Sequence, residues 1–215
     1  MATDRRPLRH IDGLLFWRLL GTGRGNATAP GADLSRSALF AVWRDEASLE
    51  AFLGEHPIPR RWERAAESWH VRLRGLAGHG AWRGFDVTAG LVEGRADGAI
   101  AVLTRADVRW RNWRSFAEGS RTVDRSAHNA PGMIDVVGVG EAPIGRLGTF
   151  SLWESLHSAR MFAAHDSTHR DMVLATRADG WFGEELFARF EPYGSTGTWD
   201  GRDPLAASRQ HTDRQ

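Results

Sequence analysis

The 215-residue chain contains neither cysteine nor lysine. Without cysteine it has no disulfide, no thiol nucleophile, no iron–sulfur cluster and no thiolate-ligated haem. All 28 cationic side chains are arginines, so Schiff-base chemistry and a lysine-held pyridoxal cofactor are excluded as well. A bound metal or haem must therefore take its ligands mainly from nine histidines, the carboxylates and the single Tyr193.

Long apolar runs are also missing, since no stretch approaches the 18 consecutive apolar residues of a membrane span. The opening MATDRRPLRH is charged and leads into a short apolar run without a small-residue cleavage site. We therefore expect no signal peptide and a cytoplasmic protein.

A net charge of +1 gives no general signal for nucleic-acid binding. The segment VRWRNWR (108–114) interleaves Arg with Trp, a pattern that could stack bases. An amphipathic element whose Arg stems lie along the surface explains the same pattern more simply, so we expect no nucleic-acid partner.

The chain partly repeats itself. SALFAVWRDEASLEAF (37–52) aligns with LGTFSLWESLHSARMF (147–162), and GAWRGFD (80–86) aligns with GTWDGRD (197–203). The offset between the two copies moves from 110 to 117 residues, which indicates a short insertion. We interpret this as one duplicated unit rather than a solenoid.

Hydrophobic periodicity and turn residues predict the elements of each half. In the second half the order is strand, helix, two strands, helix and strand, over 98–110, 111–128, 133–140, 147–155, 156–178 and 185–193. This βαββαβ order is that of a ferredoxin-like unit. The first half gives only ββαβ, over 10–21, 37–43, 45–67 and 69–76.

The expected fold class is therefore α+β, with two tandem ferredoxin-like repeats whose sheets form a barrel-like body. The N-terminal repeat, residues 8–90, lacks its first strand and helix, whereas the C-terminal repeat, residues 98–204, is complete. Residues 205–215 are expected to form a disordered tail. The incomplete repeat leaves a sheet edge that needs cover, which favours a homodimer or larger homo-oligomer.

Five segments together form an ordered set of motifs: FWRLLGTGRG (16–25), SALFAVW (37–43), AVLTRADVR (101–109), GVGEAPIGR (138–146) and THRDMVLATRADGWFGEELFARF (168–190). This set resembles the spheroidene monooxygenase family. The resemblance extends from about residue 8 to Leu205 and implies a dimeric α+β barrel fold and a haem-containing oxygenase. Family members carry a further strand and helix before the first motif, in agreement with the repeat comparison.

His169 is the candidate axial ligand of the iron, and it lies in the most family-like motif. On a helix it shares a face with Met172, Val173 and Thr176, which gives an imidazole the shielded setting that a haem ligand needs. A hydrogen-bonded core histidine would fit the same face. The first repeat has Pro59 at the matching position, so the fold itself does not require this histidine.

Two other motifs allow competing interpretations. His165 and His169 have the spacing of two zinc ligands on a helix, but Asp166 stands where zinc proteases carry glutamate, and no third ligand is evident. GTGRGN (21–26) resembles a phosphate loop, but no helix follows it directly. It is either a Gly-rich connection or, by the resemblance, a loop whose Arg24 pairs with a haem propionate.

Arg105 lies in the middle of a predicted strand, where it would act as a catalytic distal donor if it points inward. Trp153 and Phe150 are expected near the haem pocket on opposite faces of one strand. Glu184 and Glu185 could orient the ligand histidine, although a solvated turn is the simpler interpretation.

The resemblance implies a haem b (heme b) monooxygenase acting on an apolar, polyene-like small molecule. The haem site would comprise His169 as the metal ligand, with Arg24, Trp153, Met172 and Val173 around the cofactor. No flavin or nicotinamide motif is visible, so an external ferredoxin or reductase would supply electrons. The alternatives are a haem-dependent dehydratase or peroxidase acting on a nitrogen-containing metabolite, and a non-catalytic haem-binding dimer.

Overall fold

The computed structural model describes residues 4–23, 32–89, 97–112, 127, 129–141, 145–165 and 181–206. Seven strands form one sheet: β1 (Leu14–Gly23), β2 (Ala32–Trp43), β3 (Trp69–Gly80), β4 (Ile100–Val108), β5 (Met133–Gly140), β6 (Arg146–Trp153) and β7 (Phe182–Gly197). The helices are α1 (Arg5–Leu8), α2 (Glu46–Glu55), α3 (Pro57–Trp62), α5 (Leu156–His165) and the 3-10 turn η2 (Trp110–Asn112). Within these described ranges, no helix is long and apolar enough to cross a membrane.

The strand order is β2-β1-β5-β6-β4-β7-β3, and every neighbouring pair is antiparallel. The four strands of the second half lie in the order β5-β6-β4-β7, the arrangement of a ferredoxin-like unit. The first-half strands extend this sheet on both sides, β1 beside β5 and β3 beside β7. The expected α+β class is therefore confirmed.

The sheet curls until strands from distant positions in this order touch. Phe40 of β2 and Phe190 of β7 are separated by four strands, yet their ring centroids lie 6.2 Å apart. Phe40 also stacks on Trp82 at 5.4 Å, and Trp82 is almost completely buried. The concave face is thus filled by an aromatic core, which is the largest apolar cluster of the protein.

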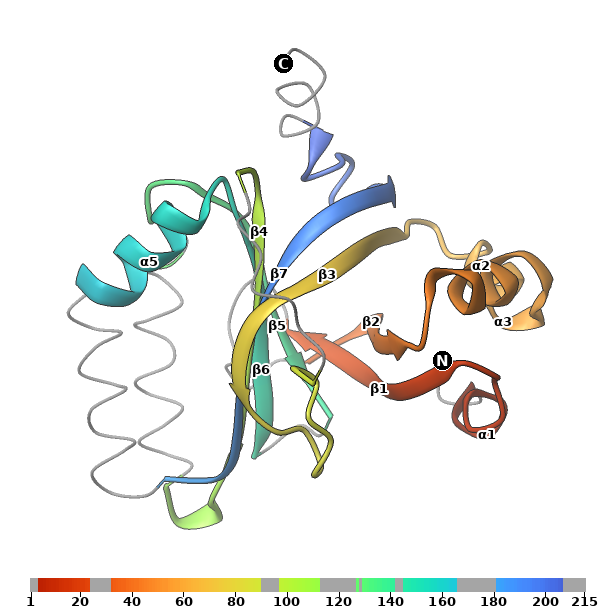
Figure 1. Cartoon of the computed structure of the whole chain (residues 1–215), viewed down its shortest axis with the longest axis horizontal. Helices are drawn as coiled ribbons and strands as arrows, with labels where there is room; N and C mark the ends of the chain where they lie inside the picture. The colour runs from red at the N-terminus through yellow and green to blue at the C-terminus, as the bar shows by residue number, and fades with distance from the viewer. Residues whose placement is uncertain are drawn as a thin grey trace.

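The convex face of the second half carries α5 (Figure 1). Phe162 of this helix packs on Trp153 of β6 with ring centroids 5.3 Å apart, over Ile100 and Val102 of β4. Since Ala101 and other β4 residues pack into the concave core, β4 is covered on both faces. This explains the unbroken apolar run at residues 100–103, where β4 begins.

The helix expected near 45–67 is broken into α2 and α3, on the side of the molecule away from α5 (Figure 1). Pro57 disfavours a helical conformation for His56, which is extended, and Pro57 then starts α3. Asp45 caps α2 by accepting a hydrogen bond from the Ser48 backbone N–H at 2.7 Å. The Ser48 side-chain and backbone bonds lower the pKa of Asp45 to about 2.

Other boundaries shift by a few residues. The first strand begins at Leu14 rather than residue 10, because Arg5–Leu8 form α1 and Gly13 has a φ of +75°. The last strand extends over Phe182–Gly197, beyond the expected 185–193, because β3 pairs with it along nearly its whole length. The expected helix at 111–128, the second half of the helix at 156–178 and most of the tail lie outside the described residues.

Two strand-to-helix turns are built alike. Arg44 donates its backbone N–H to the Gly13 carbonyl at 2.8 Å, and Glu154 donates to Gly132 at 2.8 Å. Both glycines have positive φ, +75° and +77°. The aromatic pair that follows is also matched, since Trp43 and Phe52 lie 5.1 Å apart, close to the spacing of their counterparts on β6 and α5.

We expect Gly132→Ala to destabilise the protein by about 2 kcal/mol. Alanine disfavours this left-handed conformation, and its Cβ would overlap the Ser158 hydroxyl at the start of α5. Urea unfolding followed by circular dichroism measures the change. Gly98→Ala is the control, since a Cβ there meets no atom within 4 Å; equal losses for both variants would contradict the prediction.

Candidate functional site

A buried arginine organises one end of the concave face. Arg105 of β4 points inward and is 5% exposed. Its guanidinium forms ion pairs with Glu184, with Asp107 at 2.5 Å and with Glu141 at 3.5 Å. A cation at this depth is tolerated because three carboxylates compensate its lost hydration.

The carboxylates of this group are held by further donors. Glu141 pairs with Arg18 at 2.9 Å and with Arg83 at 3.5 Å. Glu184 accepts the backbone N–H groups of Arg83 at 2.8 Å and of Gly84 at 3.1 Å. Burial alone would raise the pKa of Glu184, but these bonds together with Arg105 outweigh it and hold that pKa below its usual 4.5. Glu184 of β7 therefore has a defined role, because it binds both Arg105 and the backbone of the turn that follows β3.

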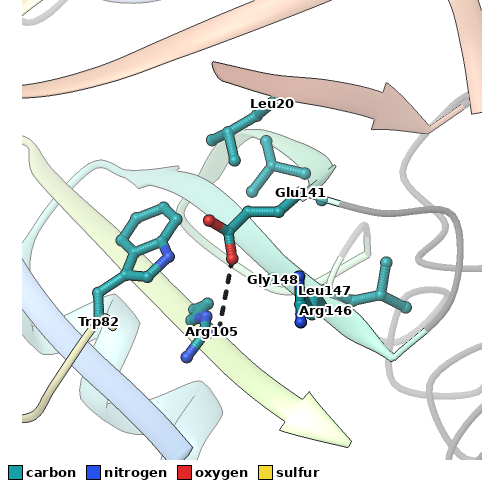
Figure 2. Close-up of a pocket in the computed structure, with 9 residues that line it drawn as sticks. Leu20, Trp82, Arg105, Glu141, Arg146, Leu147 and Gly148 are labelled. Carbon is teal, nitrogen blue, oxygen red and sulfur yellow. Dashed lines mark hydrogen bonds and ion pairs between the residues drawn. The ribbon is translucent and has the colours of Figure 1, made fainter. Parts of the chain in front are cut away.

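A shallow depression adjoins this network and is lined by Leu20, Trp82, Arg105 and Glu141 among others (Figure 2). It has no room for an organic molecule. Among the described residues, Trp82 Nε1, Arg105 Nε and Thr22 Oγ1 belong to the buried polar atoms that have no hydrogen-bond partner. The concave face thus offers a packed ion network and no substrate cavity at this point.

A much larger hollow lies on the convex face, between α5 and the edge of the sheet. It measures about 540 Å3 and is lined by Ala77, Gly78, His79, Arg160, Ala163, Ala164, Phe187 and Arg189. We call it the α5 groove. Its volume falls in the range of small-molecule sites, roughly 300–1,000 Å3.

The pairing of β3 with β7 builds the floor of the α5 groove. Ala77 lies opposite Arg189, and His79 lies opposite Phe187, so these four side chains share the face that α5 covers. A β-bulge at Leu76 shifts the register just before them. Bulges of this kind re-aim side chains and are common beside functional sites.

Two arginines face the α5 groove without a carboxylate partner among the described residues. Arg189 comes from β7 and Arg160 from α5, and no ion pair joins either to an acidic side chain there. The Nε of Arg189 is buried without an acceptor. Burial, and then the charge of Arg160, lower the pKa of Arg189.

An aromatic pair forms one wall of the α5 groove. His79 stacks on Phe187, with ring centroids 5.6 Å apart.

The structure separates two of the residues expected at one site. Trp153 is buried beneath α5 on the convex face, where its Nε1 donates to the Ser151 hydroxyl at 3.0 Å. Arg105 lies on the concave face, so the sheet stands between them. Phe150 packs against the concave core, and its expected alternation with Trp153 is confirmed. The catalytic role of Arg105 stays a prediction.

The other expected site residues are His169, Arg24, Met172 and Val173, and they lie outside the described residues. The last described residue of α5, His165, precedes His169 by four positions in the sequence. Among the residues the structure describes, no group of three His, Asp or Glu side chains could hold a metal ion.

Sequence reasoning missed three residues of the α5 groove, namely His79, Arg160 and Arg189. One signal was available: in LFARF, Arg189 alternates with the core residues Ala188 and Phe190 and so faces away from them. Nothing in the sequence indicates that α5 covers the convex face, to which Arg189 points.

We expect Arg105→Gln to cost about 3 kcal/mol of unfolding free energy at pH 7, because three carboxylates then share a buried site without their cation. The stabilisation from Glu184 is present above pH 4.5 and is lost as the pH falls through its lower folded pKa. The difference in unfolding free energy between the wild type and the variant should therefore become smaller as the pH falls toward 4, where the carboxylates protonate.

Urea unfolding at several pH values measures this effect. Arg74→Gln is the control, because Arg74 forms an exposed pair with Glu191 and should contribute less than about 1 kcal/mol. A deficit that is independent of pH would mean that Arg105 acts by packing alone.

Comparison with known proteins supplies relatives over nearly the whole chain. The spheroidene monooxygenase of Rhodobacter capsulatus is 31% identical over 210 residues, which are 96% of this chain and 87% of the relative. That of Cereibacter sphaeroides is 30% identical over 207 residues, 95% of this chain and 64% of the relative. That of Rubrivivax gelatinosus is 32% identical over 191 residues, 88% of this chain and 73% of the relative.

No protein-family model matches the chain. Two solved structures, both provisionally named monooxygenases, align loosely with it. The one from Fusobacterium nucleatum gives a TM-score of 0.45 at 12% identity over 94% of this chain and 91% of that one. The one from Lactobacillus acidophilus gives a TM-score of 0.42 at 10% identity over 90% of each chain.

The family assignment rests on the sequence relatives. Their identity across nearly the full length of this chain confirms the resemblance of the motifs, and the chain belongs to the spheroidene monooxygenase family.

Proposed function

We propose that the protein is a haem-dependent monooxygenase that oxidises an apolar small molecule. Its relatives are named for monooxygenation of spheroidene, which supports the reaction class and an apolar, polyene-like substrate. The observation that carries the haem assignment is the α5 groove, an open hollow of about 540 Å3 beside α5, whose last described residue precedes His169 by four positions in the sequence.

The residues of the α5 groove fit a haem in size and chemistry. The small side chains of Ala77, Ala163 and Ala164 leave space in the groove, and Phe187 offers an aromatic face to a flat macrocycle. The buried Arg189 Nε without an acceptor suits a ligand with carboxylates, which haem b carries at one edge. When bound there, the haem would supply the activation of oxygen or peroxide, with electrons from a ferredoxin or reductase.

We propose His169 as the axial ligand of the haem iron. Trp153 and Phe162 would act on it indirectly, since their contact fixes α5 on the sheet immediately before this histidine. Met172 and Val173 would shield the imidazole from water, and Arg24 would provide a further propionate contact. Arg105 is bound to carboxylates on the other face of the sheet from the α5 groove, so its predicted catalytic role is not part of this proposal.

Haem uptake tests the proposal. Titrating the haem-free protein with haemin should give a Soret band that shifts on addition of dithionite and carbon monoxide. His169→Ala should lose the wild-type band and regain a similar one with added imidazole, because only the iron–nitrogen bond is removed. His165→Ala is the matched control four residues away and should keep the band.

Two results would contradict this assignment. If His169→Ala kept the wild-type spectrum while His165→Ala or His70→Ala lost it, another histidine would be the ligand. If the protein took up no haem and contained stoichiometric zinc, the haem proposal itself would fail.

We also propose that β1, β2 and β3 form an incomplete ferredoxin-like unit, which the matched turns at Gly13 and Gly132 support. A first strand of this unit would lie between β2 and β3, the two edges of the sheet. Exposed edges favour pairing with another chain, so we expect a homodimer or larger homo-oligomer. Light scattering at micromolar concentration measures the mass; a fully stable monomer would contradict the expectation.

A further inference from the structure

We infer that Arg160 and Arg189 form a carboxylate-binding site in the α5 groove and hold the two carboxylates at one edge of the haem. This inference rests on the proposed function and assigns the side of the cofactor that faces the two arginines. The evidence comes from the internal repeat, from the charge balance of the groove and from its shape.

The repeat supplies the geometric evidence. At the offset of 110, Arg160 of α5 matches Glu50 of α2, and at the offset of 117, Arg189 of β7 matches Arg72 of β3. In the first half this pair of positions forms an ion pair, with Arg72 Nη1 2.6 Å from the Glu50 carboxylate. The same helix-to-strand positions in the second half therefore hold two arginines where the first half holds an acid and a base.

The alternation of the strands supports this correspondence. Trp69, Val71 and Leu73 of β3 match Leu186, Ala188 and Phe190 of β7 at the offset of 117, and all six pack into or against the concave core. Arg72 and Arg189 therefore both point to the convex face, toward α2 and α5 respectively. With Arg160 in place of Glu50, the strand arginine of the second half has no counter-ion on the described part of its helix.

The charge balance of the groove calls for a dianion. Elsewhere on these two strands the arginines are neutralised, Arg72 by Glu46 and Glu50 and Arg74 by Glu191. Arg160 and Arg189 have no such partner among the described residues, and the charge of Arg160 acts against that of Arg189. A guanidinium binds a carboxylate through parallel N–H donors, so a ligand with two carboxylates would satisfy both side chains.

The shape of the groove points to the cofactor rather than the substrate as the source of the carboxylates. Apart from the two arginines and His79, the described residues of its lining are Ala, Gly and Phe, which suit a flat apolar body. His79 is stacked on Phe187 and so presents a ring to such a body. The proposed substrate is apolar and has no carboxylates to offer.

The test compares the affinity of the haem-free protein for haemin and for haemin dimethyl ester, measured by the Soret absorbance. The wild type should bind the free diacid roughly 100-fold more tightly at low salt, about tenfold for each arginine. Arg160→Gln and Arg189→Gln should each remove about tenfold of this preference, and the double variant should show none. Arg72→Gln, the repeat counterpart of Arg189→Gln, should leave the preference unchanged.

A charge-reversal variant provides a second readout that does not depend on haem. Arg160→Glu recreates the acid–base pair of the first half, so it should raise the Tm of the haem-free protein and abolish the preference for the diacid. A lower Tm for both Arg160→Gln and Arg160→Glu would show that Arg160 already has a carboxylate partner in the chain, and would overturn the inference.

The remaining outcomes separate this inference from the proposed function. Equal binding of diacid and dimethyl ester by the wild type would overturn the carboxylate site while leaving the haem assignment intact. If those affinities were equal and Arg189→Gln instead weakened binding of a long-chain fatty acid to the haem-loaded protein, the carboxylate would belong to the substrate. Absence of any haem uptake would refute the proposed function and this inference together.

Discussion

The protein depends on the closure of one antiparallel sheet around an aromatic core. The curl brings Phe40 of β2 against Phe190 of β7 across four intervening strands, with Trp82 packed beside them. Once the concave face is filled in this way, the convex face is the surface left for helices, and α5 covers part of it. The inner strand β4 is therefore buried on both faces. The concave and the convex face of the sheet can then serve different functions.

Charge is handled in opposite ways on the two faces. On the concave side Arg105 is surrounded by three carboxylates, so its burial is compensated and its neighbourhood is closely packed. On the convex side Arg160 and Arg189 face an open groove without a described counter-charge. Compensated charge stabilises a fold, whereas uncompensated charge at a cavity favours a ligand of opposite sign. The groove is accordingly the better candidate for a binding site.

The likeness between the two halves makes their differences informative. The Trp43–Phe52 and Trp153–Phe162 contacts fix a helix on the sheet in nearly the same way in each half. The first-half helix is held further by Arg72, which pairs with its glutamates, whereas no ion pair between described residues joins α5 to the sheet. The first half thus closes its helix onto the sheet, and the second half keeps a space of about 540 Å3 beside its helix.

The sequence by itself determined the α+β class, the approximate strands and the family, because each depends on local periodicity or on aligned residues. It also predicted that Phe150 and Trp153 face opposite ways, since alternation along a strand is a local rule. Only the tertiary structure decided which face α5 covers, that Arg105 and Trp153 lie on opposite sides of the sheet, and that Arg160 meets Arg189. Those facts depend on strand order and curl, which bring together residues far apart in the chain and leave no pattern in any single segment.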